Sequence, residues 1–92
     1  MPTYLVERYF PGRDRAWLVD ALGRLRRQRT RAAHLGSTYV PADDSCFCRF
    51  EAETADDVRD ANEIAGVPFA RIVVAEEIGI GKRDQTQKGD PT

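Results

Sequence analysis

The chain has 92 residues, which is enough for one domain at most, and its 14 basic and 15 acidic side chains leave a net charge of −1. So balanced a charge argues against nucleic acid as a partner. The sequence shows no export signal and no apolar run of about 18 residues. It therefore predicts a cytoplasmic protein without a membrane partner.

The first predicted strand is Thr3–Phe10, which is rich in aromatic and branched side chains and stops at a Pro-Gly pair. A helix follows with Asp14 as its N-cap, because apolar residues then recur at the spacing of one buried helix face: Leu18, Ala21, Leu22 and Leu25. The helix could run to His34 or stop near Gln28. We favour the second ending, because it leaves room for a full second strand from about Ala32.

The middle of the chain predicts a hairpin and a second helix. Pro41–Asp44 forms the turn, and Ser45–Ala52 is the third strand. Thr54 is placed to cap the helix, and Gly66 to end it. The inward stripe of this helix is Val58, Ala61, Asn62 and Ala65.

A fourth strand, Arg71–Ile78, completes the order β-α-β-β-α-β. Two βαβ units joined by a hairpin predict an α+β, ferredoxin-like fold, with a four-stranded antiparallel sheet in the order 4-1-3-2 and both helices on one face. The domain would comprise residues 1–78, and residues 79–92 would form a polar C-terminal tail. The other face of the sheet would stay open in a single chain.

Alternation along the strands assigns side chains to the two faces of the sheet. In the third strand, the set facing the helices is Cys46, Cys48 and Phe50, and the set on the open face is Phe47, Arg49 and Glu51. In the second strand, Leu35 marks the inner set, which places His34 on the open face. The first strand leaves both possibilities, with either Glu7 or Arg8 on the open face. We therefore expect a polar ligand-binding cluster there, drawn from Glu7, Arg8, Arg49 and Glu51, with His34 beside it.

The two cysteines share one side of the third strand. Same-face residues in a strand lie roughly 6.5–7 Å apart, whereas a disulfide requires Cβ atoms about 3.8 Å apart. We therefore predict that Cys46 and Cys48 do not bridge each other, as expected in a reducing cytoplasm. Buried cysteine behaves as a small apolar residue, so a role in the core is favoured over a role as metal ligand.

Several passages resemble a family of small single-domain proteins that takes its name from a nickel-binding member. They are Ser37–Asp44, Cys46–Ala52 and Ala65–Val73, which together with Thr3–Arg8 span nearly all of the predicted domain. The resemblance implies a ferredoxin-like fold, a homodimer paired through its sheet faces, and a divalent transition metal such as nickel. The sequence departs from relatives that carry a His-Ser-Tyr motif in the second strand, since it has Gly36–Tyr39 at that point.

The candidate metal ligands are His34 and Cys48, because nickel and zinc favour imidazole and thiolate donors. Alternation points them to opposite faces, so we predict weak metal binding that depends more on His34 than on the cysteines.

The leading hypothesis is a small dimeric binding protein that holds a metal ion or a small ligand at the open face. The alternative is an enzyme of the dimeric α+β barrel kind, an isomerase, cyclase or cofactor-free oxygenase acting on a small aromatic or polyketide-like substrate. In that enzyme Glu7 or Arg8 would shuttle a proton with His34.

Overall fold

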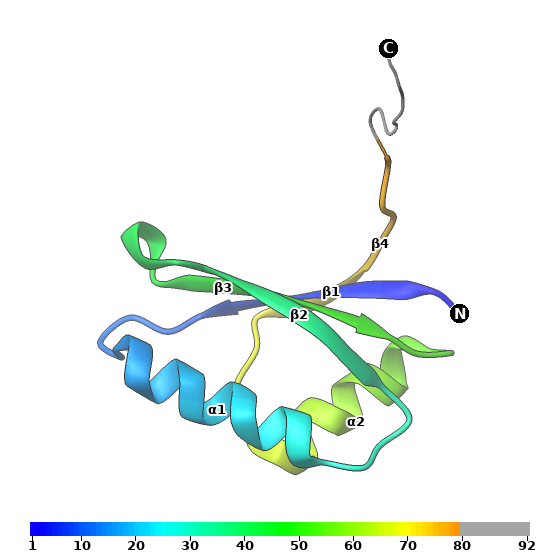
Figure 1. The fold of residues 1–92 in the computed structure, drawn as a ribbon, viewed down its shortest axis with the longest axis horizontal. Helices are drawn as coiled ribbons and strands as arrows, with labels where there is room; N and C mark the ends of the chain where they lie inside the picture. The colour runs from blue at the N-terminus through cyan, green and yellow to red at the C-terminus, as the bar shows by residue number, and fades with distance from the viewer. Residues whose placement is uncertain (80–92) are drawn as a thin grey trace.

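The elements of the computed structural model, which describes residues 1–79, follow the predicted order (Figure 1). They are β1 (Thr3–Tyr9), α1 (Arg15–Arg27), β2 (Ala33–Val40), a short 3-10 helix (Pro41–Asp43), β3 (Ser45–Glu51), α2 (Ala55–Ala65) and β4 (Arg71–Ala75). The end of α1 at Arg27 confirms the shorter of the two expected helices, and β4 ends at Ala75 rather than at Ile78. Apart from Gly79, the predicted tail lies outside the described residues.

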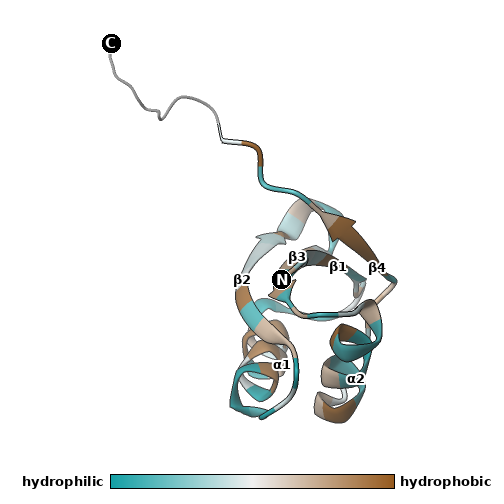
Figure 2. Ribbon diagram, turned by 90° about the vertical axis from the view of Figure 1, so that its right-hand side faces the viewer, coloured by the Kyte–Doolittle hydropathy of each residue, from teal (hydrophilic) through white to brown (hydrophobic). Residues whose placement is uncertain are grey.

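The four strands form one sheet in the order β2-β3-β1-β4, and every neighbouring pair is antiparallel. Both helices lie on the same face of this sheet (Figure 2). No element of residues 1–79 covers the other face, which we call the open face. The predicted ferredoxin-like fold is therefore confirmed.

The helices begin where their capping residues predict. The Asp14 carboxylate accepts a hydrogen bond from the Trp17 backbone N–H at 2.9 Å, and the Thr54 hydroxyl accepts one from the Asp57 N–H at 3.1 Å. Gly66 ends α2 with φ 70°, a backbone conformation that glycine adopts without a steric penalty. Local sequence thus fixes the ends of the helices that cover the inner face of the sheet.

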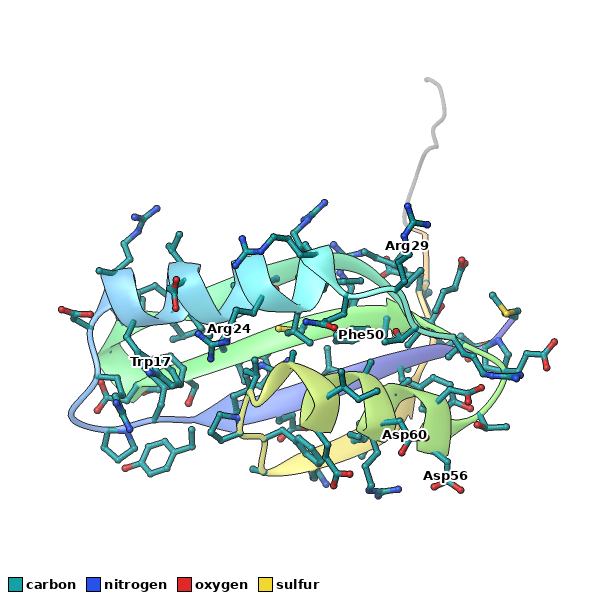
Figure 3. All side chains as sticks on the ribbon, turned by 90° about the horizontal axis from the view of Figure 1, so that it is seen from below. Trp17, Arg24, Arg29, Phe50, Asp56 and Asp60 are labelled. Carbon is teal, nitrogen blue, oxygen red and sulfur yellow. The ribbon has the colours of Figure 1, made fainter. Side chains whose placement is uncertain are left out.

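The hydrophobic core lies between the helices and the inner face of the sheet. Buried and half-buried residues alternate along β3, and its buried set is Cys46, Cys48 and Phe50, as predicted. Phe50 is only 1% exposed and lies between α1 and α2 when the molecule is seen from the helix side (Figure 3). None of the helices in this described region has the length and apolar character needed to cross a membrane.

A β-bulge interrupts β2. Its register with β3 shifts between His34, which lies opposite Phe50, and Gly36, which lies opposite Arg49, so Leu35 is the extra residue. In a regular strand, two residues three positions apart point to opposite faces. The bulge places both His34 and Ser37 on the inner face, because one added residue reverses the alternation.

Candidate functional site

Three of the predicted ligand-binding residues lie on the open face. Glu7, Arg49 and Glu51 all alternate with fully buried positions of β1 and β3, and each remains partly exposed. Glu7 lies directly opposite Arg71 of β4, and its Oε2 is 2.9 Å from the Arg71 Nη2. The open face therefore carries the charged residues that strand alternation assigned to it.

Gly36 makes room for the Arg49 side chain on the open face. A Cβ atom at position 36 would lie only 2.6 Å from the Arg49 Nη2, so the guanidinium rests where any other residue would place its side chain. Arg49 is thus drawn toward the edge strand β2.

The two open-face carboxylates do not meet within one chain. Glu7 lies opposite Phe47 in the register of β1 with β3, and Glu51 lies four positions further along β3. At about 3.3 Å per residue, this separates the two positions by roughly 13 Å. One subunit therefore cannot bring both carboxylates to a single ion.

The structure corrects the expected place of Arg8. Its residue is only 2% exposed and its side chain lies on the inner face, so of the two alternatives in the first strand it is Glu7 that faces the open side. The Arg8 guanidinium donates to Cys48 Sγ at 3.4 Å, to the Pro68 carbonyl at 3.0 Å and to Asn62 Oδ1 at 2.6 Å. Arg8 shares its set with Tyr4, Val6 and Phe10, and burying these three apolar side chains outweighs the cost of burying one hydrogen-bonded arginine.

The prediction that His34 lies on the open face is also wrong, and the bulge in β2 is the reason. The His34 ring stacks on Phe50 of the core, with ring centroids 5.0 Å apart and an interplanar angle of 27°. Its Nε2 lies 2.8 Å from the Ser37 hydroxyl oxygen. Leu35, which was expected to mark the inner set, is instead 43% exposed. His34 and Cys48 therefore face the same side of the sheet.

Ser37 connects the imidazole to the thiol. Its hydroxyl donates to Cys48 Sγ at 3.0 Å, and a hydroxyl has only one proton to donate. The Nε2 of His34 must then carry the hydrogen of the bond to Ser37, which leaves Nδ1 of a neutral ring without one. This Nδ1 is buried and has no hydrogen-bond partner.

Cys46 completes the group that we call the inner polar cluster: Arg8, His34, Ser37, Cys46, Cys48 and Asn62. Both cysteines are free and fully buried, and their sulfur atoms lie 3.8 Å apart. Hydrogen bonding from Cys46 lowers the pKa of the Cys48 thiol, and His34, Arg8 and Ser37 lower it further, against the opposing effect of burial. The same bond to Cys48, together with burial, raises the pKa of Cys46.

Two features of the sequence pointed to this cluster without being recognised. Asn62 stood in the inward stripe of the second helix, and a buried amide needs a polar partner. The set containing Arg8 was also the more apolar of the two sets in the first strand. The bulge that brings in His34 had a weaker signal, because Gly36 follows the extra residue Leu35 and a glycine inside a strand can mark either a bulge or a close approach.

Fold and site together define a class of protein: a single ferredoxin-like domain with an uncovered sheet face and a buried cluster of arginine and thiols. The nickel responsive protein SCO4226-like family matches residues 4–74, and the chain belongs to this family. The crystal structure of SCO4226 from Streptomyces coelicolor A3(2) is similar, with a TM-score of 0.73 and 16% sequence identity over 84% of this chain and 99% of that chain. At this identity the likeness shows the fold alone. No curated protein matches the chain.

The inner polar cluster does not fit a divalent cation such as nickel. The unpartnered Nδ1 of His34 is one suitable donor. However, the Arg8 guanidinium already lies beside Cys48, and its positive charge opposes a second cation there. Within residues 1–79, no group of three or more histidine, cysteine, aspartate or glutamate side chains is placed to hold a metal ion.

Proposed function

We propose that this chain is a small binding protein that works as a homodimer and takes its ligand, a nickel-type divalent cation or a small polar molecule, between the open faces of two sheets. The observation that carries this proposal is the composition of the open face. It combines charged side chains with apolar ones that a single chain leaves half-buried: Leu5, Phe47 and Val73. Ligand pockets combine apolar side chains with a few placed polar groups, and the open face offers both kinds.

Pairing through the open face is supported by what a monomer would expose. Soluble monomers seldom leave neighbouring apolar side chains uncovered, and a second copy of the sheet would cover Leu5, Phe47 and Val73. The two free cysteines of the described region are in keeping with a reducing, cytoplasmic setting.

Phe47→Asp is expected to convert the dimer to a monomer. Phe47 lies on β3, between Glu7 on β1 and Thr38 on β2, so its side chain projects near the middle of the open face. A carboxylate placed there would be buried without a partner on dimerisation. Light scattering should give twice 10.4 kDa for the wild type and one chain mass for the variant.

The matched control is Ile64→Asp, since Ile64 is a 63% exposed apolar residue on α2, away from the open face. It should remain dimeric. A wild type with the mass of one chain at micromolar concentration, or a Phe47→Asp variant that stays dimeric, would contradict pairing through the open face.

The carboxylates of two subunits are the donors available for a cation at this interface. The pair between Glu7 and Arg71 is 64% exposed on the arginine side, and exposed ion pairs are weak, so a metal ion can displace it. Glu51 is the second carboxylate. Arg49 lies between them along the face and opposes a cation, while its planar guanidinium suits an anionic group on a small ligand. Nickel binding should therefore be weak.

Calorimetric titration of nickel is expected to show binding that Glu51→Gln weakens and that Cys48→Ser leaves unchanged, because Arg8 already compensates Cys48. His34→Ala should also leave nickel binding unchanged, because His34 faces the core rather than the open face. Binding that survives Glu51→Gln but disappears in His34→Ala or Cys48→Ser would move the metal to the inner polar cluster. An absence of nickel binding in all variants would leave the small polar molecule as the ligand of the open face. The enzyme hypothesis gains no support from the family match.

A further inference from the structure

The inner polar cluster contains a buried positive charge without a carboxylate partner. Arg8 is 2% exposed, and none of the ion pairs formed by residues 1–79 includes it. Its other two partners, the Asn62 amide oxygen and the Pro68 carbonyl, are neutral. An unpaired buried charge is costly, so the third partner, Cys48, is the group that can neutralise it by losing its proton.

We propose that Arg8 holds Cys48 as a thiolate and that this thiolate is a site of oxidation by hydroperoxides as small as hydrogen peroxide. This role is separate from ligand binding at the open face and does not depend on it.

The hydrogen bonds around Cys48 all suit an anionic sulfur. Arg8 Nε and the Ser37 hydroxyl donate to it, and the His34 Nε2–H in turn supports Ser37. With Cys48 ionised, the bond between the two sulfurs at 3.8 Å must be donated by the Cys46 S–H. Hydrogen bonds to a charged acceptor are stronger than neutral ones, so this arrangement favours the thiolate over the thiol.

Cys46 provides an internal control for the effect of these donors. The two cysteines lie on the same strand, two residues apart, and each is 0% exposed. Only Cys48 receives donors from Arg8 and Ser37. Because the thiolate is the nucleophile, a difference between them in how the oxidation rate depends on pH reports the charge on sulfur.

The oxidation is balanced without a further reagent. The Cys48 thiolate attacks one oxygen of hydrogen peroxide, so that an S–O bond forms and the O–O bond breaks. The leaving hydroxide takes the proton of the new sulfenic acid, which gives water and a sulfenate anion. The sulfur is oxidised by two electrons and the peroxide is reduced by two. The sulfenate keeps the negative charge beside Arg8.

The surroundings select a small oxidant. Cys48 is fully buried, and the exposed residue Ser37 covers it with a hydroxyl 3.0 Å from the sulfur. Rotation of an exposed serine side chain is fast, and we expect it to admit a molecule as small as hydrogen peroxide. Bulky thiol reagents should be excluded. The sulfur atoms lie 3.8 Å apart, but same-face residues of a strand lie roughly 6.5–7 Å apart along the backbone, so a disulfide between Cys46 and Cys48 would require the strand to distort.

The test is exposure of the native protein to hydrogen peroxide at pH 6 and pH 8, with oxidation at each cysteine followed by mass spectrometry of peptides. Cys48 should oxidise at least about tenfold faster than Cys46, and its rate should change by less than about twofold between the two pH values. An ordinary thiol with a pKa of about 8.5 would react about 75-fold more slowly at pH 6 than at pH 8. A bulky maleimide should modify neither cysteine until the protein is unfolded.

Arg8→Gln removes the charge and should restore the steep pH dependence of oxidation at Cys48. Cys46→Ser keeps a donor to Cys48 and should leave the rate at Cys48 nearly unchanged. If Arg8→Gln does not fold, the pH dependence of oxidation at Cys48 in the wild type still decides the question. Equal oxidation of both cysteines, a steep loss of the Cys48 rate at pH 6, or a Cys48 that resists peroxide until unfolding would overturn the proposal.

Discussion

Replacing Arg8 with alanine should cost about 3–5 kcal/mol of unfolding free energy, the range found when one partner of a buried charge pair is removed. The variant loses three hydrogen bonds at once, to Cys48, Asn62 and Pro68. It also leaves the Asn62 amide oxygen buried without a donor, and it removes the positive charge beside the Cys48 sulfur. Since small domains have about 5–15 kcal/mol of total stability, this one change could remove much of it.

The matched control is Arg59→Ala. Arg59 on α2 also forms an ion pair, with Asp56 of the same helix. In this pair the arginine side chain is 45% exposed and the aspartate side chain 85% exposed. An exposed pair contributes at most about 1 kcal/mol. Urea unfolding at neutral pH measures both variants. An Arg8→Ala loss no larger than that of Arg59→Ala would show that the inner polar cluster does not stabilise the fold.

The free energy of unfolding should rise with pH between mildly acidic and mildly alkaline solution, because of Cys48. Its pKa is lowered in the folded state, first by the bond from Cys46, then by His34, Arg8 and Ser37, while an unfolded thiol has a pKa of about 8.5. The contribution is complete above that value. It is lost as pH falls through the folded pKa, because the unfolded chain binds a proton that the folded chain does not.

Cys46 acts in the opposite direction. Its pKa is raised in the folded state by the bond to Cys48 and by burial, so its contribution is complete below about pH 8.5 and is lost as pH rises further. Below about pH 8.5, the rise in unfolding free energy caused by Cys48 should approach about 1.4 kcal/mol per pH unit at its steepest. Urea unfolding across pH should therefore show a maximum, whose acidic side flattens in Cys48→Ser and whose alkaline side flattens in Cys46→Ser. An unchanged acidic slope in Cys48→Ser would contradict the ionisation assigned to Cys48.

The fold could be predicted because its signals are local. The caps at Asp14 and Thr54, the stop at Gly66 and the apolar stripes each depend on a few neighbouring residues, and all of them appear in the structure. Strand alternation also placed both faces of β3 correctly, because its sequence alternates without interruption.

The inner polar cluster could be predicted only in part, because it depends on contacts between distant residues. A single bulge at Leu35 reversed the face of His34. Gly36 can mark such a bulge, but a glycine inside a strand can equally mark a close approach, as Gly36 does with Arg49, so the sequence alone did not place the bulge. Arg8 finds its partners 40 to 60 positions away, on β3, α2 and the loop that follows α2. In the first strand, only the larger apolar content of the set containing Arg8 favoured burying the arginine over the glutamate.

The ultraviolet absorbance of thiolate tests the central claim, that Cys48 is ionised beside Arg8, most directly. At neutral pH the native wild type and Cys46→Ser should each show one thiolate per chain, and Cys48→Ser should show none. Acidification should remove the signal only well below the ordinary pKa of a thiol, about 8.5. A wild type without thiolate absorbance at neutral pH, or a signal that persists in Cys48→Ser, would contradict the account.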